Sequence, residues 1–183
     1  MDAADRLVPL IPLTAGLGEL LESGLYSDLR ICCSDGSVFN VHKMVICAQS
    51  AFFKSAIDPC GTNHPTTLTL GNDDPVAVKA LIEYLYKFNY TVVHENDRGA
   101  LFLFHIKVCA IGEAYGIRAL RDLARDRAKI VFENSPTLNE LKIPQAIRTI
   151  YDMDVATDSG LRDLIVDLSK ANVDDLLEMG AFS

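Results

Sequence analysis

His42 and Lys43 are adjacent in this sequence, and together with Asp28 they are the residues best suited to do chemistry. An imidazole exchanges protons near neutral pH, so His42 is the natural candidate for a general acid or base. Such a base needs an oriented nucleophile or a glycine loop that binds phosphate, and neither pattern surrounds His42. We therefore expect no enzymatic activity, and we predict that the His42 ring makes local hydrogen bonds.

Asp28 and Lys43 carry opposite charges on either side of a short apolar stretch. An acid before a strand and a base at a helix start could pair across a hairpin. We favour a structural ion pair that fixes the corner between hairpin and helix, because half-buried ion pairs are often architectural.

The cysteines and histidines show no pattern typical of a metal site or a disulfide framework. Cys60 and His64 could donate two ligands, and Cys47 could approach them. A tetrahedral site needs a second close pair, which is missing, so we expect neither metal nor cofactor. The cysteine count is odd, and the adjacent Cys32 and Cys33 would point to opposite faces of a strand. This usage indicates a reducing compartment, in the nucleus or cytoplasm.

Composition limits the class of protein. The 183 residues are 49% hydrophobic and 23% charged, enough for one folded core with a small appended part. A net charge of −8 repels phosphate backbones, so we expect no nucleic acid as partner. No apolar run is long enough to cross a membrane, and the apolar stretch from Leu7 to Leu21 lacks a positive leader and is interrupted by Pro9 and Pro12.

Local patterns predict the elements that position the candidate residues. Leucines at helical spacing precede Ser23-Gly24, which indicates a short helix, and alternating apolar residues over 29–33 and 38–41 flank a turn, which indicates a β-hairpin. Helical periodicity over 42–57, with Ser50 as a predicted N-cap, indicates two short helices. A third strand is predicted over 67–70.

Three longer helices are predicted in the second half. Asp74 before Pro75 marks a helix start, and an apolar helix over 100–115 and an amphipathic helix over 117–131 follow. The turn formers of 134–137 indicate a boundary, and amphipathic segments near 161–168 and 173–179 follow it. We therefore predict an α/β (α+β) domain over 17–132, with a small sheet covered by helices, and a helical C-terminal extension over 133–183.

This order of elements resembles the BTB/POZ family, and two motifs carry most of the resemblance over residues 17–131. They are Tyr26-Ser27-Asp28-Leu29-Arg30-Ile31, similar to the family's strand opening, and Phe39-x-Val41-His42-Lys43-x-Val45-Ile46-x-Ala48-x-Ser50-x-x-Phe53, similar to its hairpin-to-helix segment. The chain is also similar to fungal single-BTB proteins.

The resemblance implies the BTB/POZ fold and a non-catalytic protein-interaction module. Members of the family pair through their first helix, which corresponds here to Leu17, Leu20 and Leu21; the alternative is a leucine face that packs inside the chain. Asp28 and Lys43 match charged residues near the dimer groove, where some members bind extended peptides. Lysine stands where some members have arginine, which keeps the charge but loses the two-pronged geometry.

The alternative function that the family implies is a substrate adaptor on a cullin scaffold of a ubiquitin ligase. The segment 57–67 contains no glutamate to complete the hydrophobic-x-Glu contact of cullin-binding members. The region 136–183 is too short for kelch repeats and has no zinc-finger residues. We therefore expect a homodimer with an unidentified protein partner, and a cullin only as the alternative.

Overall fold

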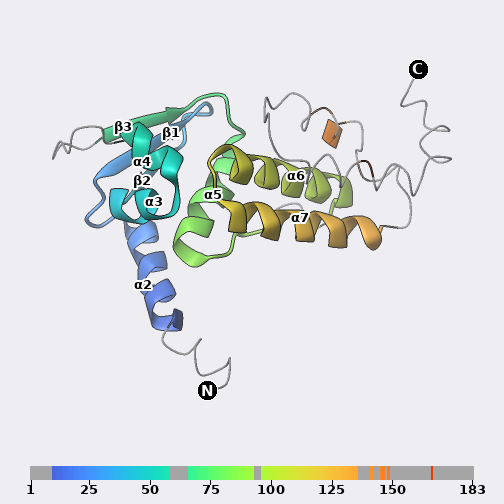
Figure 1. Ribbon diagram of the computed structural model, residues 1–183, viewed down its shortest axis with the longest axis horizontal. Helices are drawn as coiled ribbons and strands as arrows, with labels where there is room; N and C mark the ends of the chain where they lie inside the picture. Colours follow the sequence, from blue (N-terminus) through green and yellow to red (C-terminus); the bar gives the residue numbers. More distant parts are fainter. Residues whose placement is uncertain are drawn as a thin grey trace. The chain divides into compact units, whose positions relative to one another are not determined.

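The computed structural model describes residues 10–57, 66–92 and 96–135, with residues 141, 145, 146, 148 and 166. The chain divides into two compact units, Met1–Thr91 and Val92–Ser183, and each is described by itself. The first unit holds the sheet and four helices, and the second holds a pair of long helices (Figure 1).

Helix α2 runs over Leu10–Ser23, so it is longer than the short helix that the leucine spacing predicted. Pro12 falls in its first turn, where amides have no partner inside the helix and a proline is tolerated. The helix ends as expected, because Gly24 adopts a left-handed φ of 64° and donates its N–H to the carbonyl of Leu20 at 2.9 Å.

The predicted hairpin and third strand form one mixed sheet in the order β2-β1-β3. Strand β1 (Leu29–Cys33) is antiparallel to β2 (Val38–Val41), and Ile31 lies opposite Phe39. Strand β3 (Thr66–Leu70) runs parallel to β1, which the sequence pattern did not indicate. The inner face is apolar, and its buried members are Leu29, Ile31, Cys33, Val41 and Leu70.

The short paired helices are α3 (Lys43–Gln49) and α4 (Ala51–Ile57). Ser50 caps α4 as predicted, because its hydroxyl accepts the N–H of Phe53 at 3.2 Å. Helix α5 (Pro75–Lys87) begins at the predicted cap, where Asp74 accepts the N–H groups of Val76 and Ala77. Helix α5 contacts both α2 and α3.

The second unit consists of α6 (Arg98–Ala114) and α7 (Arg118–Glu133), packed against each other. Helix α6 begins two residues before the expected start, capped by Asp97, which accepts the N–H of Ala100 at 2.9 Å. The helices come closest at Gly112, where a Cβ would lie 2.8 Å from the main-chain nitrogen of Arg121. This contact requires glycine.

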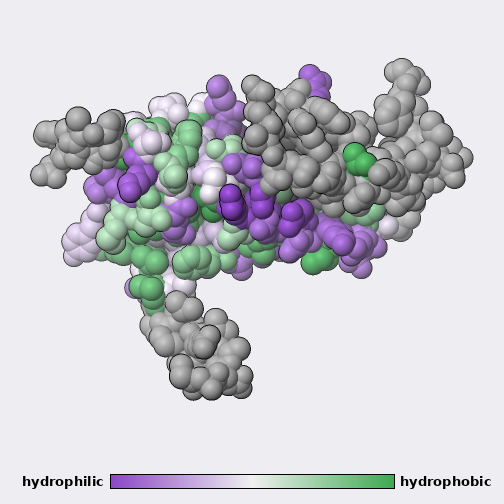
Figure 2. Space-filling model, in the orientation of Figure 1, coloured by the Kyte–Doolittle hydropathy of each residue, from purple (hydrophilic) through white to green (hydrophobic). Residues whose placement is uncertain are grey.

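The exposed side of α7 is hydrophilic, as Figure 2 shows. Its cations pair with nearby acids: Arg121 with Glu113 at 3.0 Å and Arg125 with Asp122 at 3.3 Å. These ion pairs are those of a solvated helix face.

The predicted α+β class with a small sheet and a helical majority is confirmed by the three strands and six helices of the described residues. The helix α7 ends at Glu133, directly before the predicted boundary at 134–137. The extension 133–183 lies almost entirely outside the described residues, together with its predicted helices.

Candidate functional site

Asp28 and Lys43 meet at the corner where the hairpin leads into α3. The Asp28 carboxylate accepts the main-chain N–H of Lys43 at 2.7 Å. His42 occupies the N-cap position of α3, but its side chain makes no capping hydrogen bond. Asp28 therefore supplies the cap from the strand side, which satisfies a free amide and places a negative charge at the positive end of the helix. This hydrogen bond needs no lysine side chain.

The His42 side chain is 8% exposed and joins three segments of the first unit. Its Nδ1 lies 2.8 Å from the Tyr86 hydroxyl, and its Nε2 lies 2.7 Å from the carbonyl oxygen of Leu25. The Tyr86 hydroxyl also accepts the main-chain N–H of His42 at 2.7 Å. Because a carbonyl can only accept, Nε2 carries the proton, and the phenol donates to Nδ1. Every polar atom of this network then has a partner.

Tyr86 is fully buried, and burial is the main reason that the pKa of its phenol is raised to about 12. The negative charge of Asp28 raises this pKa further, while the hydrogen bond from the main chain of His42 lowers it. The phenol is therefore neutral at physiological pH and cannot serve as a base. The two ring partners of His42 are a neutral phenol and a main-chain carbonyl, and neither is an activated nucleophile. Both ring nitrogens of His42 are thus engaged within the fold, an arrangement that can hold the corner rigid.

A second polar link in the same unit joins α3 to α5. The Gln49 side-chain amide donates to the carbonyl oxygens of Val45 at 3.1 Å and of Leu85 at 2.6 Å. The carbonyl of Leu85 lies in the last turn of α5, where helical carbonyls lack intrahelical partners. Sequence reasoning missed both Gln49 and Tyr86 as site residues. One available signal was a tyrosine among the buried positions of this helix, because a buried phenol requires a hydrogen-bond partner.

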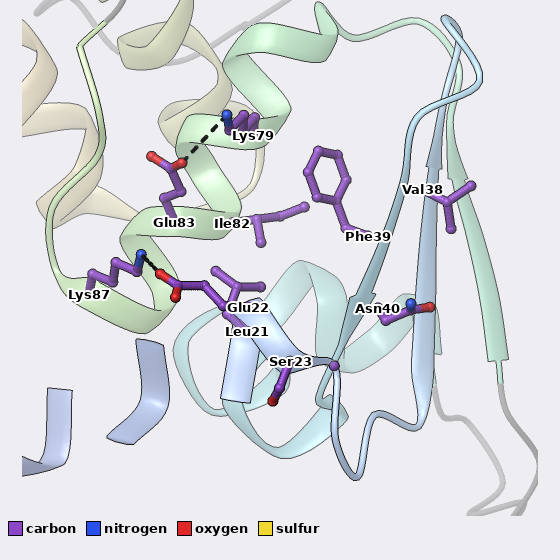
Figure 3. A pocket seen from close by; sticks show the side chains of 11 residues that line it. Leu21, Glu22, Ser23, Val38, Phe39, Asn40, Lys79, Ile82, Glu83 and Lys87 are labelled. Carbon is purple, nitrogen blue, oxygen red and sulfur yellow. Dashed lines mark hydrogen bonds and ion pairs between the residues drawn. The ribbon is translucent and has the colours of Figure 1, made fainter. Parts of the chain in front are cut away.

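The three leucines proposed for dimerisation do not all lie on the same side of α2. Each is half-buried. Leu21 faces a cavity that Ile82 of α5 also lines (Figure 3). Successive residues of an α-helix are turned by about 100°, so Leu20 lies on the side of α2 opposite Gly18, and Leu17 lies about 100° around the helix from Gly18. Leu13, on the same side as these two, is 57% exposed. The outer face of α2, defined by Leu13, Leu17 and Leu20, is thus apolar and partly exposed.

The opposite side of α2 is attached to α5. A Cβ at Gly18 would lie 3.2 Å from Cε of Lys87, so the Lys87 side chain packs closely over α2 at this position. Lys87 also forms an ion pair with Glu22 at 2.8 Å, and this hydrogen bond and charge lower the pKa of the Glu22 carboxyl. These contacts set which side of α2 remains available to a partner.

The buried thiols of the described residues are poor nucleophiles. Burial raises the pKa of the Cys33 thiol, and it raises that of Cys109 to about 12, which keeps both protonated and unreactive. No group of three metal-ligating side chains occurs among these residues, and Cys60 and His64 lie outside them. No helix in the same part is long and apolar enough to span a bilayer.

Comparison with known proteins accounts for this combination of elements. Residues 17–123 match the family model of the BTB/POZ domain. BTB/POZ and MATH domain-containing protein 5 of Arabidopsis thaliana is 35% identical over 124 residues, which are 62% of this chain and 30% of that protein. Zinc finger protein chinmo of Drosophila melanogaster is 31% identical over 83 residues, 45% of this chain and 14% of that protein. The chain thus spans less than a third of these relatives.

The likeness extends to three dimensions. The BTB domain of zebrafish PATZ1 superposes with a TM-score of 0.50 over 71% of this chain and 97% of that domain, at 14% identity. At this identity the likeness shows the fold alone, and the expected BTB fold is confirmed.

Proposed function

The chain belongs to the BTB/POZ domain family, and from this premise we propose that it forms a homodimer through the outer face of α2 and binds a further protein partner. A BTB domain is a protein-interaction and dimerisation module, typically without catalytic activity. The chemistry of the His42 corner agrees with such a role, because the ring nitrogens and main-chain N–H of His42 all form hydrogen bonds within the fold.

The observation that carries the proposal is the arrangement of α2. One side is attached to α5 through Gly18 and Glu22, while the other presents Leu13 and the half-buried Leu17 and Leu20. The part of α2 that is coloured by hydropathy in Figure 2 is largely hydrophobic. A contiguous apolar surface on a helix favours burial against another chain, and a twofold axis lets the same face serve both copies.

Sedimentation velocity over micromolar concentrations tests the dimer. We expect the wild-type chain to sediment with twice the monomer mass, and Leu20→Asp to sediment as a monomer, because a carboxylate cannot be buried unpaired in an apolar interface. A matched control is Ala15→Asp, which adds the same charge to the same helix at an exposed position about 140° away. A wild-type chain that remains monomeric at tens of micromolar would refute the proposal.

The alternative partner is a cullin scaffold, as for the adaptors of the family. Helix α4, which precedes the segment 58–65, presents Phe52 at 45% exposure. A purified-component pull-down with wild type and Phe52→Ala tests this alternative: wild type should bind the cullin, and the variant, which lacks this exposed apolar ring, should bind more weakly. A location in the nucleus or cytoplasm stays a prediction, and fluorescence microscopy of the tagged chain tests it.

A further inference from the structure

Strand β2 forms an edge of the sheet, and part of its main chain faces outward. The main-chain N–H of Cys33 donates to the carbonyl of Ser37 at 2.9 Å, so these two residues form a hydrogen-bonded pair between the strands. Ile31 and Phe39, which lie opposite each other, are each two residues along their strand from that pair. Antiparallel ladders alternate, so Phe39 bonds to β1 while the N–H and C=O groups of Val38 and Asn40 point to the free edge. Within the described residues, no turn or loop hydrogen bond uses those groups, and no further strand lies beyond β2 in the sheet. An unpaired edge of this kind can accept another strand.

A cavity of about 370 Å³ lies directly beside this edge, between the end of α2, β2 and α5 (Figure 3). Its apolar lining comes from Leu21, Val38, Phe39 and Ile82, beside the uncharged polar side chains of Ser23 and Asn40. Two ion pairs form its rim: Glu22 with Lys87 at 2.8 Å, and Glu83 with Lys79 at 3.9 Å. The volume is that of a small binding site, and the rim carries no net charge.

We propose that the β2 edge binds an extended segment of a partner protein, which adds a strand beside β2 and places an uncharged apolar side chain in the cavity. The unpaired main-chain groups supply the hydrogen bonds of strand addition, and the apolar lining selects the side chain. Because the rim charges already neutralise one another, the inserted side chain is uncharged. The site is separate from the outer face of α2 and does not depend on dimerisation.

The geometry also distinguishes a single strand from a second copy of the chain. Residues of α2 and α5 lie beside β2 at the cavity, so a second copy paired edge to edge would bring its own α2 and α5 against them. A single extended peptide carries no such flanking helices and can lie at the strand spacing of about 4.8 Å from β2. A partner segment therefore fits this site better than a twofold pairing of two β2 strands.

Selection of a phage-displayed library of random, unconstrained eight-residue peptides on the full chain tests the proposal. We expect enriched peptides with apolar residues at alternate positions. On binding, the exchange of the Val38 and Asn40 amides should slow at least roughly tenfold, because they become hydrogen-bonded. Val38→Pro removes one outward N–H at the first position of the strand, where proline is tolerated, and should weaken binding roughly fivefold.

A second pair of variants separates loss of binding from loss of folding. Ser23→Trp fills the cavity from an exposed position that lines it, and should abolish peptide enrichment. Ser55→Trp is its control, because Ser55 is also exposed and its hydroxyl makes a similar bond to a helical carbonyl, 2.9 Å against 2.7 Å for Ser23. Peptides that bind wild type and Ser23→Trp equally, or no enrichment on wild type at all, would overturn the proposal whatever the state of the dimer.

Discussion

Tyr86→Phe tests whether the His42 corner is held by the hydroxyl of Tyr86. The substitution keeps the ring but removes one oxygen, which accepts the main-chain N–H of His42 at 2.7 Å and contacts its Nδ1 at 2.8 Å. A buried N–H left without a partner costs about 1–3 kcal/mol, and the lost bond to the ring adds about 1 kcal/mol. We therefore expect the free energy of unfolding to fall by about 2–4 kcal/mol.

Urea unfolding monitored by circular dichroism measures this change, provided that the slope with denaturant stays constant. Tyr26→Phe is the matched control, because Tyr26 is 86% exposed and its hydroxyl is solvated in both states. We expect that control to lie within about 0.5 kcal/mol of wild type. The Tyr86→Phe substitution should also cost less in a His42→Leu background, because the contact with the ring is already absent there. If Tyr86→Phe is as mild as Tyr26→Phe, the reasoning about the corner is wrong.

Three further predictions concern packing, pH and capping. In thermal unfolding, Gly112→Ala should destabilise the chain by about 1–3 kcal/mol, because its Cβ would lie 2.8 Å from the main chain of Arg121. In the same assay, Gly16→Ala should instead stabilise α2 by about 0.5–1 kcal/mol, because nothing lies within 4 Å of its Cβ. Burial, aided by a nearby arginine, lowers the pKa of His105 from 6.5 to about 4. Between these two pH values the unfolded chain binds more protons than the folded chain. The free energy of unfolding should therefore fall by about 3 kcal/mol as the pH drops from neutral to about 4. That part of the pH slope should disappear in His105→Gln, and an unchanged slope would contradict the assignment. Asp28→Ala should cost about 1 kcal/mol by uncapping α3, whereas Asp28→Asn should recover most of it, since an amide oxygen also accepts the capping N–H.

The sequence alone determined the elements whose signals are local. Asp74-Pro75 and Ser50 predict helix starts, Gly24 predicts a helix end, and the structure confirms all three. Such signals depend on residues within a few positions of one another, because caps and turns are completed by neighbouring amides and carbonyls. The same is true of the hairpin, whose alternating residues already specify which side is buried.

Only the tertiary structure decided which distant groups meet. The chain pattern placed His42 at a corner, but its partner Tyr86 lies 44 residues away, and the lysine that holds Glu22 lies 65 residues away. The parallel pairing of β3 with β1 and the inward direction of Leu21 also depend on packing. No local pattern can specify these contacts, because each depends on how helices and strands that are far apart in sequence are brought together in space. The sequence indicated which side chains need partners, and the fold determined which partners they have.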